Sequence, residues 1–424
     1  MLKSSRFFLL GSLLCLPALA APPQALASFD YVWQTIADKH YNPAELEKLP
    51  NGESWQQVRA RLRPQVEAAQ TTDQVRAVLR EMLRTLGKSH YAIAGPEFQP
   101  TGNRREGGPA TPGFVVEIVE SKVLVTHVKP GSEAERAGLR LGWELVDVEG
   151  INVAKTITPQ MRPIDRHRIL KDQISGFHGE QLPFSFATPQ GPRKILLQLP
   201  APDGSTGFGY IQGVSVDREA RLLGTRQDVA YFRLGMFLDA VRVLPEFEKF
   251  VLANASARGF VLDLRGNPGG IAIMANALSG WFLKDSGIKL GTMYQRQMTL
   301  EFVVIPRLQP FLGPLAILID GASASTSEIL AGGLQHLGRA RLFGAPTAGA
   351  ALPSLIEQLP NGDFFQYAVA NYISASGQSL EGQGVKPDVA APHTRAALLR
   401  GEDRALAAAL DWIYAHPSGP PARP

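Results

Sequence analysis

From residue 229 onward, short apolar runs alternate with segments of helical periodicity. The apolar runs are VAYFRLG, GFVLDLR, LAILID and RARLFG, and the helical segments between them cover residues 238–254, 270–284 and 327–337. Short apolar runs of this kind are typical of buried strands, and strands separated by helices form a mostly parallel sheet covered by helices. This alternation predicts an α/β core over residues 207–416.

Two regions of different pattern precede this core. Residues 21–100 show apolar side chains at helical spacing, such as Phe29, Val32 and Ile36, and predict a helical N-terminal region. Residues 107–203 contain short alternating strands, tight turns and short helical stretches. Gly- and Pro-rich stretches at 101–112 and 201–206 read as linkers, and the tail at 417–424 as disordered.

The first twenty residues have the pattern of a cleavable signal peptide. Lys3 and Arg6 form a basic start, an apolar stretch follows, and Ala18-Leu19-Ala20 is a small-residue cleavage site. Residues 1–20 are therefore expected to be removed, leaving a periplasmic or secreted protein. The one cysteine, Cys15, lies inside this segment, so the mature chain has neither a disulfide nor a thiol nucleophile.

Charge and composition exclude several classes of protein. Without Lys3 and Arg6 the chain has 41 basic and 39 acidic side chains, a net charge of +2 that gives no reason to expect nucleic acid as a partner. No run of 18 apolar residues predicts an integral membrane span. No nucleotide-binding loop and no zinc-spaced His/Glu cluster is present, so we expect no cofactor and no metal.

One segment combines a buried strand, a small-residue turn and a helix start. It runs AILIDGASASTSEILAGG over residues 316–333. A serine in such a turn is exposed, and the free N–H groups of the helix start can stabilise an oxyanion. Ser323, Ser325 and Ser327 compete for the role of nucleophile. The alternative is a plain N-cap, because Ser325 and Glu328 have capping-box spacing.

Three further motifs carry polar groups suited to catalysis. In GFVLDLRGNPGG, residues 259–270, glycines after a strand offer unhindered N–H donors, although a plain strand–loop–helix turn would look the same. In LGKSHY, His90 is a candidate base beside Ser89, or else a structural histidine. In SLEGQGVKPD, Glu381 could orient a base, or be a solvated loop acid.

Residues 107–203 resemble a PDZ domain of the bacterial processing-protease type. The resemblance rests on GFVV at 113–116, PGSEA at 130–134, AGL at 137–139, Gly142 and VEG at 148–150, and departs from the usual aspartate at Trp143. It implies that Gly113, Phe114, Val115 and Val116 form the loop and strand edge that bind a peptide.

Together, the motifs resemble the C-terminal processing proteases, serine peptidases with a PDZ domain, over nearly the whole mature chain. The resemblance is greatest to their branch related to tricorn protease and the interphotoreceptor retinoid-binding proteins. It implies that Ser325 is the nucleophile and that Thr326, with Gly269 or Gly270, supplies the oxyanion N–H groups. One branch of the family uses a Ser-Lys dyad, but its lysine position holds Ala350 here.

The tricorn-like branch instead uses a histidine supported by a serine and a glutamate. This implies a tetrad of Ser325, His90, Ser89 and Glu381, with His90 as the base and an apparent pKa of roughly 6–7. The expected function is an exported serine endopeptidase that cleaves peptide or protein substrates through an acyl-enzyme. The alternative is a non-catalytic protein that keeps the fold and binds peptide or lipid; the oligomeric state stays open.

Overall fold

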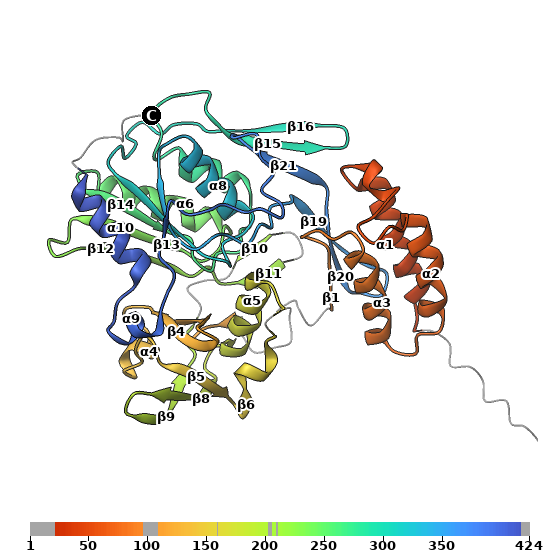
Figure 1. Ribbon diagram of the computed structural model, residues 1–424, viewed down its shortest axis with the longest axis horizontal. Helices are drawn as coiled ribbons and strands as arrows, with labels where there is room; N and C mark the ends of the chain where they lie inside the picture. Colours follow the sequence, from red (N-terminus) through yellow and green to blue (C-terminus); the bar gives the residue numbers. More distant parts are fainter. Residues whose placement is uncertain (1–21, 96–108, 159, 202–205, 209–210, 417–424) are drawn as a thin grey trace, which may run out of the picture.

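The computed structural model describes residues 22–95, 109–158, 160–201, 206–208 and 211–416. The predicted signal peptide, the tail at 417–424 and the greater part of both predicted linkers lie outside these residues. The described chain forms a helical unit (22–95), a small β-rich middle unit (109–201) and a larger core unit (206–416), as Figure 1 shows. Within these residues no helix is long and apolar enough to cross a membrane.

The helical unit consists of three α-helices and a short 3-10 helix, namely α1 (Ala25–Lys39), α2 (Trp55–Glu67), α3 (Thr72–Arg84) and the 3-10 turn Pro43–Leu46. Ser54 and Thr71 cap α2 and α3 in capping boxes. The apolar faces of the helices pack into one cluster that also contains Phe365 and Tyr367 of the core unit. The segment after α3 continues into β1 (Ala92–Ala94), which pairs with β20 (Phe364–Ala368).

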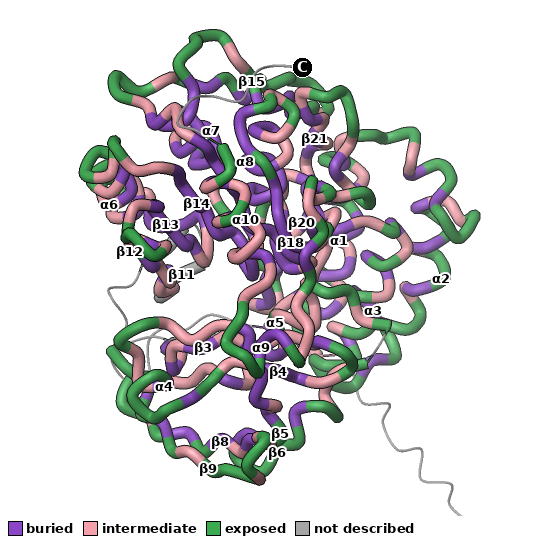
Figure 2. The backbone as a smooth tube through the Cα atoms, turned by 60° about the vertical axis from the view of Figure 1, so that its left-hand side comes forward, coloured by how far each residue is buried: buried purple, intermediate pink, exposed green. Residues whose placement is uncertain are grey.

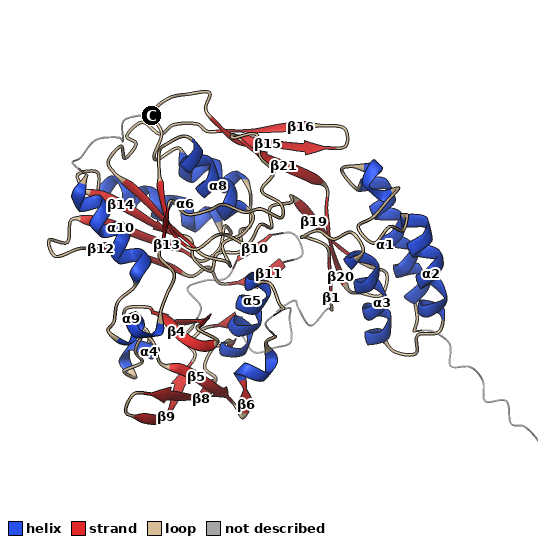
Figure 3. Ribbon diagram, viewed as in Figure 1, coloured by secondary structure: helices blue, strands red, loops and turns tan. Residues whose placement is uncertain are grey.

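The middle unit has its own sheet and its own hydrophobic cluster. Strands run in the order β3-β4-β5-β8-β9, with β6 beside β5. Helix α5 lies beside the edge strand β3 (Figure 3). The elements are β2 (Pro109–Ala110), β3 (Phe114–Val119), β4 (Lys122–Val128), α4 (Glu133–Arg136), β5 (Glu144–Val148), β6 (Ile151–Asn152), the 3-10 helix Val153–Thr156, α5 (Pro163–Ile174), β7 (Gly176–Phe177), β8 (Gln181–Thr188) and β9 (Gly191–Gln198).

The core unit is built on a six-stranded sheet, in the order β12-β13-β14-β17-β18-β22. All neighbouring pairs are parallel except the antiparallel pair β12–β13. The predicted apolar runs correspond to β13 (Val229–Leu234), β14 (Gly259–Asp263), β17 (Leu315–Ile319) and β18 (Arg341–Gly344), and the other strands of this sheet are β12 (Arg218–Leu223) and β22 (Val389–Ala390).

Helices cover both faces of this sheet, and the strands are buried (Figure 2). Strand residues such as Phe232 and Leu262 pack with α6, α7 and α8, whereas Tyr231 and Val261 pack with α10. The helices are α6 (Ala240–Ala253), α7 (Ile273–Ser279), α8 (Thr326–His336), α9 (Arg395–Leu399) and α10 (Arg404–Ala415). Helix α7 is shorter than the segment 270–284 that its periodicity predicts.

Several strands of the core unit were not predicted. Two three-stranded sheets have the orders β16-β15-β21 and β1-β20-β19, and β10 pairs with β11. Their residues alternate weakly; in β16, for example, only Phe302 is buried, so the sequence gives little periodic signal. The strands are β10 (Thr206–Phe208), β11 (Ile211–Val214), β15 (Lys289–Gln295), β16 (Thr299–Val303), β19 (Ser354–Gln358), β20 (Phe364–Ala368) and β21 (Ala370–Ser374).

Candidate active site

Ser325 occupies the N-cap of α8 in a strained backbone conformation. Its φ is +54°, in the left-handed region that residues other than glycine seldom adopt. The Ser325 N–H donates to the Ala350 carbonyl oxygen and to Glu328 Oε2, both at 2.9 Å. The predicted capping box with Glu328 is therefore confirmed. Strain of this kind is held by surrounding contacts and is frequent at functional sites.

The three competing serines differ in what their hydroxyl groups do. Ser323 Oγ donates to the Leu264 carbonyl oxygen at 2.8 Å, and Ser327 Oγ donates to the Asn267 carbonyl oxygen at 2.9 Å. Both of these side chains are fully buried. Ser325 is partly exposed, and its hydroxyl donates to no described residue. Of the three serines, Ser325 alone is free to react.

The glycine-rich loop after β14 lies directly against Ser325. A Cβ on Gly269 would stand 2.7 Å from Ser325 Cβ and 2.9 Å from the Thr326 nitrogen, so only glycine fits here. The Gly269 N–H donates to Asn267 Oδ1 at 2.9 Å, which corrects its expected role as a free oxyanion donor. Within the described chain, the N–H groups of Gly270 and Thr326 have no acceptor.

His90, Ser89 and Glu381 form one hydrogen-bonded chain. Ser89 Oγ lies 2.7 Å from His90 Nδ1 and donates to Glu381 Oε2, also at 2.7 Å. The Ser89 N–H donates to Glu381 Oε1 at 2.7 Å. His90 has a φ of +60°, just after α3 ends, so the turn itself orients the imidazole. The structure thus joins the LGKSHY and SLEGQGVKPD motifs.

The segment at Ala350 and Ala351 links this chain to the serine. The Ala350 carbonyl accepts the Ser325 N–H at 2.9 Å, and the next residue, Ala351, donates its N–H to Glu381 Oε2 at 3.1 Å. Among the described residues no hydrogen bond joins Ser325 Oγ to the His90 ring. Such contacts are often loose without substrate. Ala350 is buried.

Burial sets the protonation state of His90. It lowers the pKa of the imidazole to about 4, while the charge of Glu381 raises the pKa and the charge of Arg162 lowers it further. At neutral pH His90 is therefore unprotonated, as a general base must be. The expected pKa of roughly 6–7 was wrong for this state of the protein, because the sequence does not reveal how deeply the ring is enclosed.

Lys88, the residue before Ser89, is not available as a general base. Its ammonium forms an ion pair with Glu45 Oε2 at 3.0 Å and lies 5.5 Å from the centroid of the Tyr41 ring. Burial lowers the pKa of Lys88, but the hydrogen bonds to Tyr41 and Glu45 outweigh it, so the net shift is upward. A lysine that stays protonated cannot accept the serine proton.

Sequence reasoning missed Asp320 and Asn267 and gave Glu328 only as a capping partner of Ser325, yet all three hold the site together. Glu328 is buried and accepts hydrogen bonds from Thr347 Oγ1 at 2.6 Å and the N–H groups of Gly349 and Ala350. Asp320 accepts from the N–H groups of Gly266, Ala322 and Ser323. Asn267 accepts the Gly269 N–H and donates to Leu234. A short polar residue flanked by glycines is the signal that could have indicated Asp320 and Asn267.

The expected peptide-binding residues Gly113, Phe114, Val115 and Val116 lie where the middle unit meets the core unit. They line a cavity of about 340 Å³ that Arg265 and Gly266 of the glycine-rich loop also border. They do not contact the serine. No group of three or more His, Cys, Asp or Glu side chains arranged to hold a metal occurs in the part of the chain that the structure describes.

Two protein-family models match parts of this chain. Residues 228–391 match the model of peptidase family S41, and residues 24–84 match that of the tricorn protease C1 domain. The chain therefore contains a peptidase family S41 domain. Its enzyme class is therefore a serine-type peptidase, and the predicted kinship with the carboxyl-terminal processing proteases is confirmed.

Two similar curated proteins are named as carboxyl-terminal-processing enzymes. The carboxyl-terminal-processing protease of Picosynechococcus sp. is 26% identical over 87% of this chain and 82% of its own length. Carboxyl-terminal-processing peptidase 3 of Arabidopsis thaliana is 27% identical over 73% of this chain and 59% of its own length.

Solved structures share the fold. The photosystem II D1 C-terminal processing protease has a TM-score of 0.54 at 21% identity, covering 91% of this chain and 99% of that chain. Tricorn protease has a TM-score of 0.53 at 15% identity, covering 92% of this chain and 37% of that chain.

Proposed function

We propose that this protein is an exported serine endopeptidase of the C-terminal processing type. Ser325 is the nucleophile, His90 the general base and acid, and Glu381 acts through Ser89 to orient the imidazole. The observation that carries the proposal is the chain from Glu381 through Ser89 to His90, which meets the Ser325 turn at Ala350 and Ala351. Export rests on the pattern of residues 1–20.

The geometry suits acyl transfer. Because Ser89 occupies Nδ1 of His90, Nε2 is the nitrogen that takes the Ser325 proton as Oγ attacks the substrate carbonyl. The N–H groups of Thr326 and Gly270 then bind the oxyanion. His90 gives its proton to the leaving amine, which leaves an acyl-serine. Water, deprotonated by His90, attacks the acyl carbon; the acid product leaves, and the imidazolium returns its proton to Ser325 Oγ.

Glu381 favours the charged intermediate. Its carboxylate raises the pKa of His90 and so stabilises the imidazolium that forms in each half of the reaction. Ser89 transmits this effect, since it donates to the carboxylate and contacts Nδ1. No lysine is needed at position 350 in this arrangement.

The middle unit is well suited to capture peptide as a PDZ domain. Strand β3 lies at the edge of its sheet, and α5 lies alongside, so an extended peptide can add as a further strand between them. Gly113 has a φ of +85°, and a Cβ there would meet Ser132 Cβ at 2.3 Å. The loop at the start of β3 thus requires glycine, as a backbone loop that binds a carboxylate does.

Covalent labelling tests the catalytic role against the alternative of a non-catalytic binding protein. A fluorophosphonate should label the full chain at Ser325 and should stop hydrolysis of a peptide substrate. Labelling must disappear in Ser325→Ala and in His90→Ala. A folded protein that takes no label and hydrolyses no peptide would be a binding protein that keeps the fold.

A further inference from the structure

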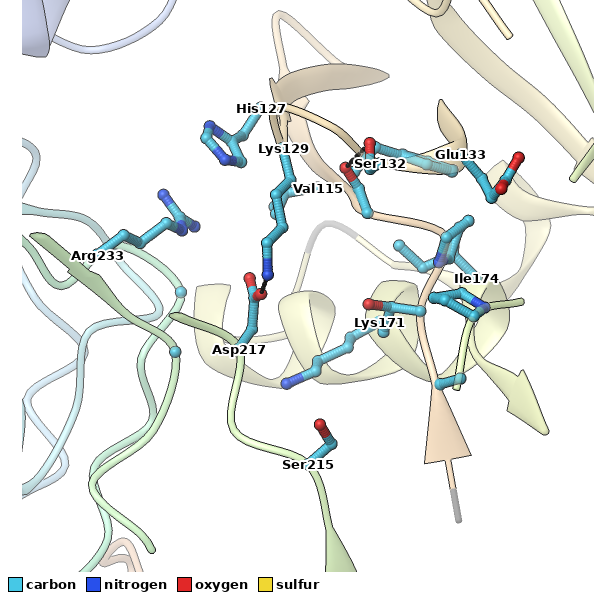
Figure 4. Close-up of a pocket in the computed structure, with 18 of the residues that line it drawn as sticks. Val115, His127, Lys129, Ser132, Glu133, Lys171, Ile174, Ser215, Asp217 and Arg233 are labelled. Carbon is cyan, nitrogen blue, oxygen red and sulfur yellow. Dashed lines mark hydrogen bonds and ion pairs between the residues drawn. The ribbon is translucent and has the colours of Figure 1, made fainter. Parts of the chain in front are cut away.

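One lysine in the cavity between the middle and core units has no counter-ion. The cavity, of about 340 Å³, is bounded by the start of β3, the loop before α4, one side of α5 and the strand β13 region of the core. Figure 4 shows Lys171 reaching from α5 toward the space beside Asp217 and Ser215, with His127 and Arg233 facing the same space. The charged side chains that face this cavity determine which ligand charge it favours.

Every other cation of the cavity is neutralised by an acid. Lys129 pairs with Asp217 at 2.6 Å, and Arg233 pairs with Asp263 at 2.9 Å. The remaining pairs are Arg136 with Glu133, Arg265 with Asp263 and Asp403, and Arg218 with Glu246. The ammonium of Lys171 forms no ion pair and no hydrogen bond with any described residue. The cavity therefore has one uncompensated positive charge.

Lys171 is exposed and lines this cavity. Desolvation lowers the pKa of its ammonium, and the charge of Arg233 lowers it further, while Asp217 and Asp172 offset this only in part. A carboxylate that enters the cavity can accept the hydrogen bonds of this unpaired ammonium. The cavity thus favours an anionic ligand over a neutral one of the same shape.

The position of Lys171 indicates which part of a peptide it meets. It faces the same cavity as Gly113 and Phe114, where a strand added to β3 would end. In that arrangement the loop N–H groups take the terminal carboxylate, and the side chain of the last residue projects toward α5. Phe114, Val116 and Ile174 line the same space and would cover the aliphatic part of that side chain.

We propose that Lys171 selects substrates whose last residue has a carboxylate side chain. The proposal rests on the proposed capture of peptide by the middle unit and names its substrate class, namely chains ending in aspartate or glutamate. Lys171 is then a specificity residue that lies apart from the catalytic groups.

Peptide binding to the full chain bearing Ser325→Ala tests this directly. Fluorescent peptides of one sequence would end in glutamate, glutamine, leucine or lysine, with a glutamate peptide amidated at its terminus as a fifth probe. We expect the Kd for the glutamate peptide to be at least tenfold below that for glutamine. Lys171→Met should remove this ratio, and Lys171→Glu should invert the preference toward lysine. Lys194→Met, on the exposed side of β9, is the matched control and should keep the ratio.

The outcomes separate this proposal from the one on which it rests. Equal binding of the glutamate and glutamine peptides, or a ratio that persists in Lys171→Met, overturns the selectivity while leaving capture intact. If Lys171→Met weakens binding of the glutamate peptide but not of its amidated form, Lys171 binds the terminal carboxylate, which also overturns the selectivity. Circular dichroism checks that each variant is folded. If no peptide binds at all, both the capture role and the selectivity are wrong, whereas peptide hydrolysis by the unmodified chain still tests the catalytic role.

Discussion

The hydroxyl of Ser89 donates to the carboxylate of Glu381 at 2.7 Å across 292 positions of sequence. This bond ties the end of the helical unit to a loop of the core unit. Because the neighbouring residue, His90, is held by the same hydroxyl, the placement of the proposed base depends on two units at once. Changes at Ser89 or Glu381 should therefore affect catalysis more than stability.

Replacement of the nucleophile should separate chemistry from folding. In Ser325→Ala we expect peptide hydrolysis to fall by about 10⁴-fold or more, with a change of about 1 kcal/mol or less in the free energy of unfolding. Ser323→Ala and Ser327→Ala each remove a buried hydrogen bond, to the carbonyl oxygens of Leu264 and Asn267, and should lower that free energy by about 0.5–1.5 kcal/mol. Kinetics and urea unfolding check this; label retained in Ser325→Ala and lost in Ser323→Ala would contradict it.

Loss of the carboxylate of Glu381 should slow the reaction without preventing substrate binding. Glu381→Gln keeps the shape of the side chain but removes the charge that stabilises the imidazolium, so kcat should fall by roughly 10²- to 10⁴-fold. Ser89→Ala should have an effect of similar size, and the double variant should cost little more, since the residues act as one chain. Glu402→Gln, at an exposed ion pair with Arg400, is the control. If the two single changes instead lowered kcat independently, so that their effects multiplied in the double variant, the two residues would not act as one hydrogen-bonded chain.

The pH profile should reflect the depressed pKa of His90. A base must be unprotonated, so kcat/KM for a small activated ester should rise with pH through a midpoint near 4, well below the value of free imidazole, about 6.5. Arg162→Met should raise the midpoint, because the charge of Arg162 lowers this pKa. Preincubation at each pH controls for unfolding. A midpoint at or above that of free imidazole would show that the ring is not enclosed during catalysis.

Lys88 should be dispensable for catalysis. Its ammonium is paired with Glu45, so Lys88→Met should retain more than about a tenth of the activity, whereas His90→Ala should lose at least about 10³-fold. Steady-state kinetics on the same ester compare the two. The reverse result, activity kept in His90→Ala and lost in Lys88→Met, would assign the base to lysine.

The loop at the start of β3, which contains Gly113, should matter for large substrates only. In Gly113→Ala the new methyl group meets Ser132, and the positive φ adds strain, so the loop must shift. We expect processing of a protein substrate to slow several-fold more than hydrolysis of a small ester, which needs only the catalytic groups. Gly179→Ala is the control: it lies in the same unit at a φ of +82°, with open space around it. Equal effects on both substrates would make the loop a purely structural turn.

Sequence periodicity predicted the buried strands of the main sheet closely. Residues of β13, β14 and β17 are apolar on both sides because helices cover both faces, and such runs stand out from their surroundings. Strands β1, β16 and β19 lack such runs. Their pairing depends on partners distant in sequence, such as Ile93 with Phe365, which local patterns do not encode.

The chemical groups of the site can be read from the sequence: a small-residue turn with three serines, a glycine-rich loop, a Ser-His pair and a glycine-flanked glutamate. Which of these groups can react depends on how the chain packs. The tertiary structure engages Ser323, Ser327 and the Gly269 N–H in hydrogen bonds, it pairs Lys88 with Glu45, and it encloses His90. Hydrogen bonding and burial depend on neighbours from every unit of the fold, and these neighbours exist only once the chain has packed.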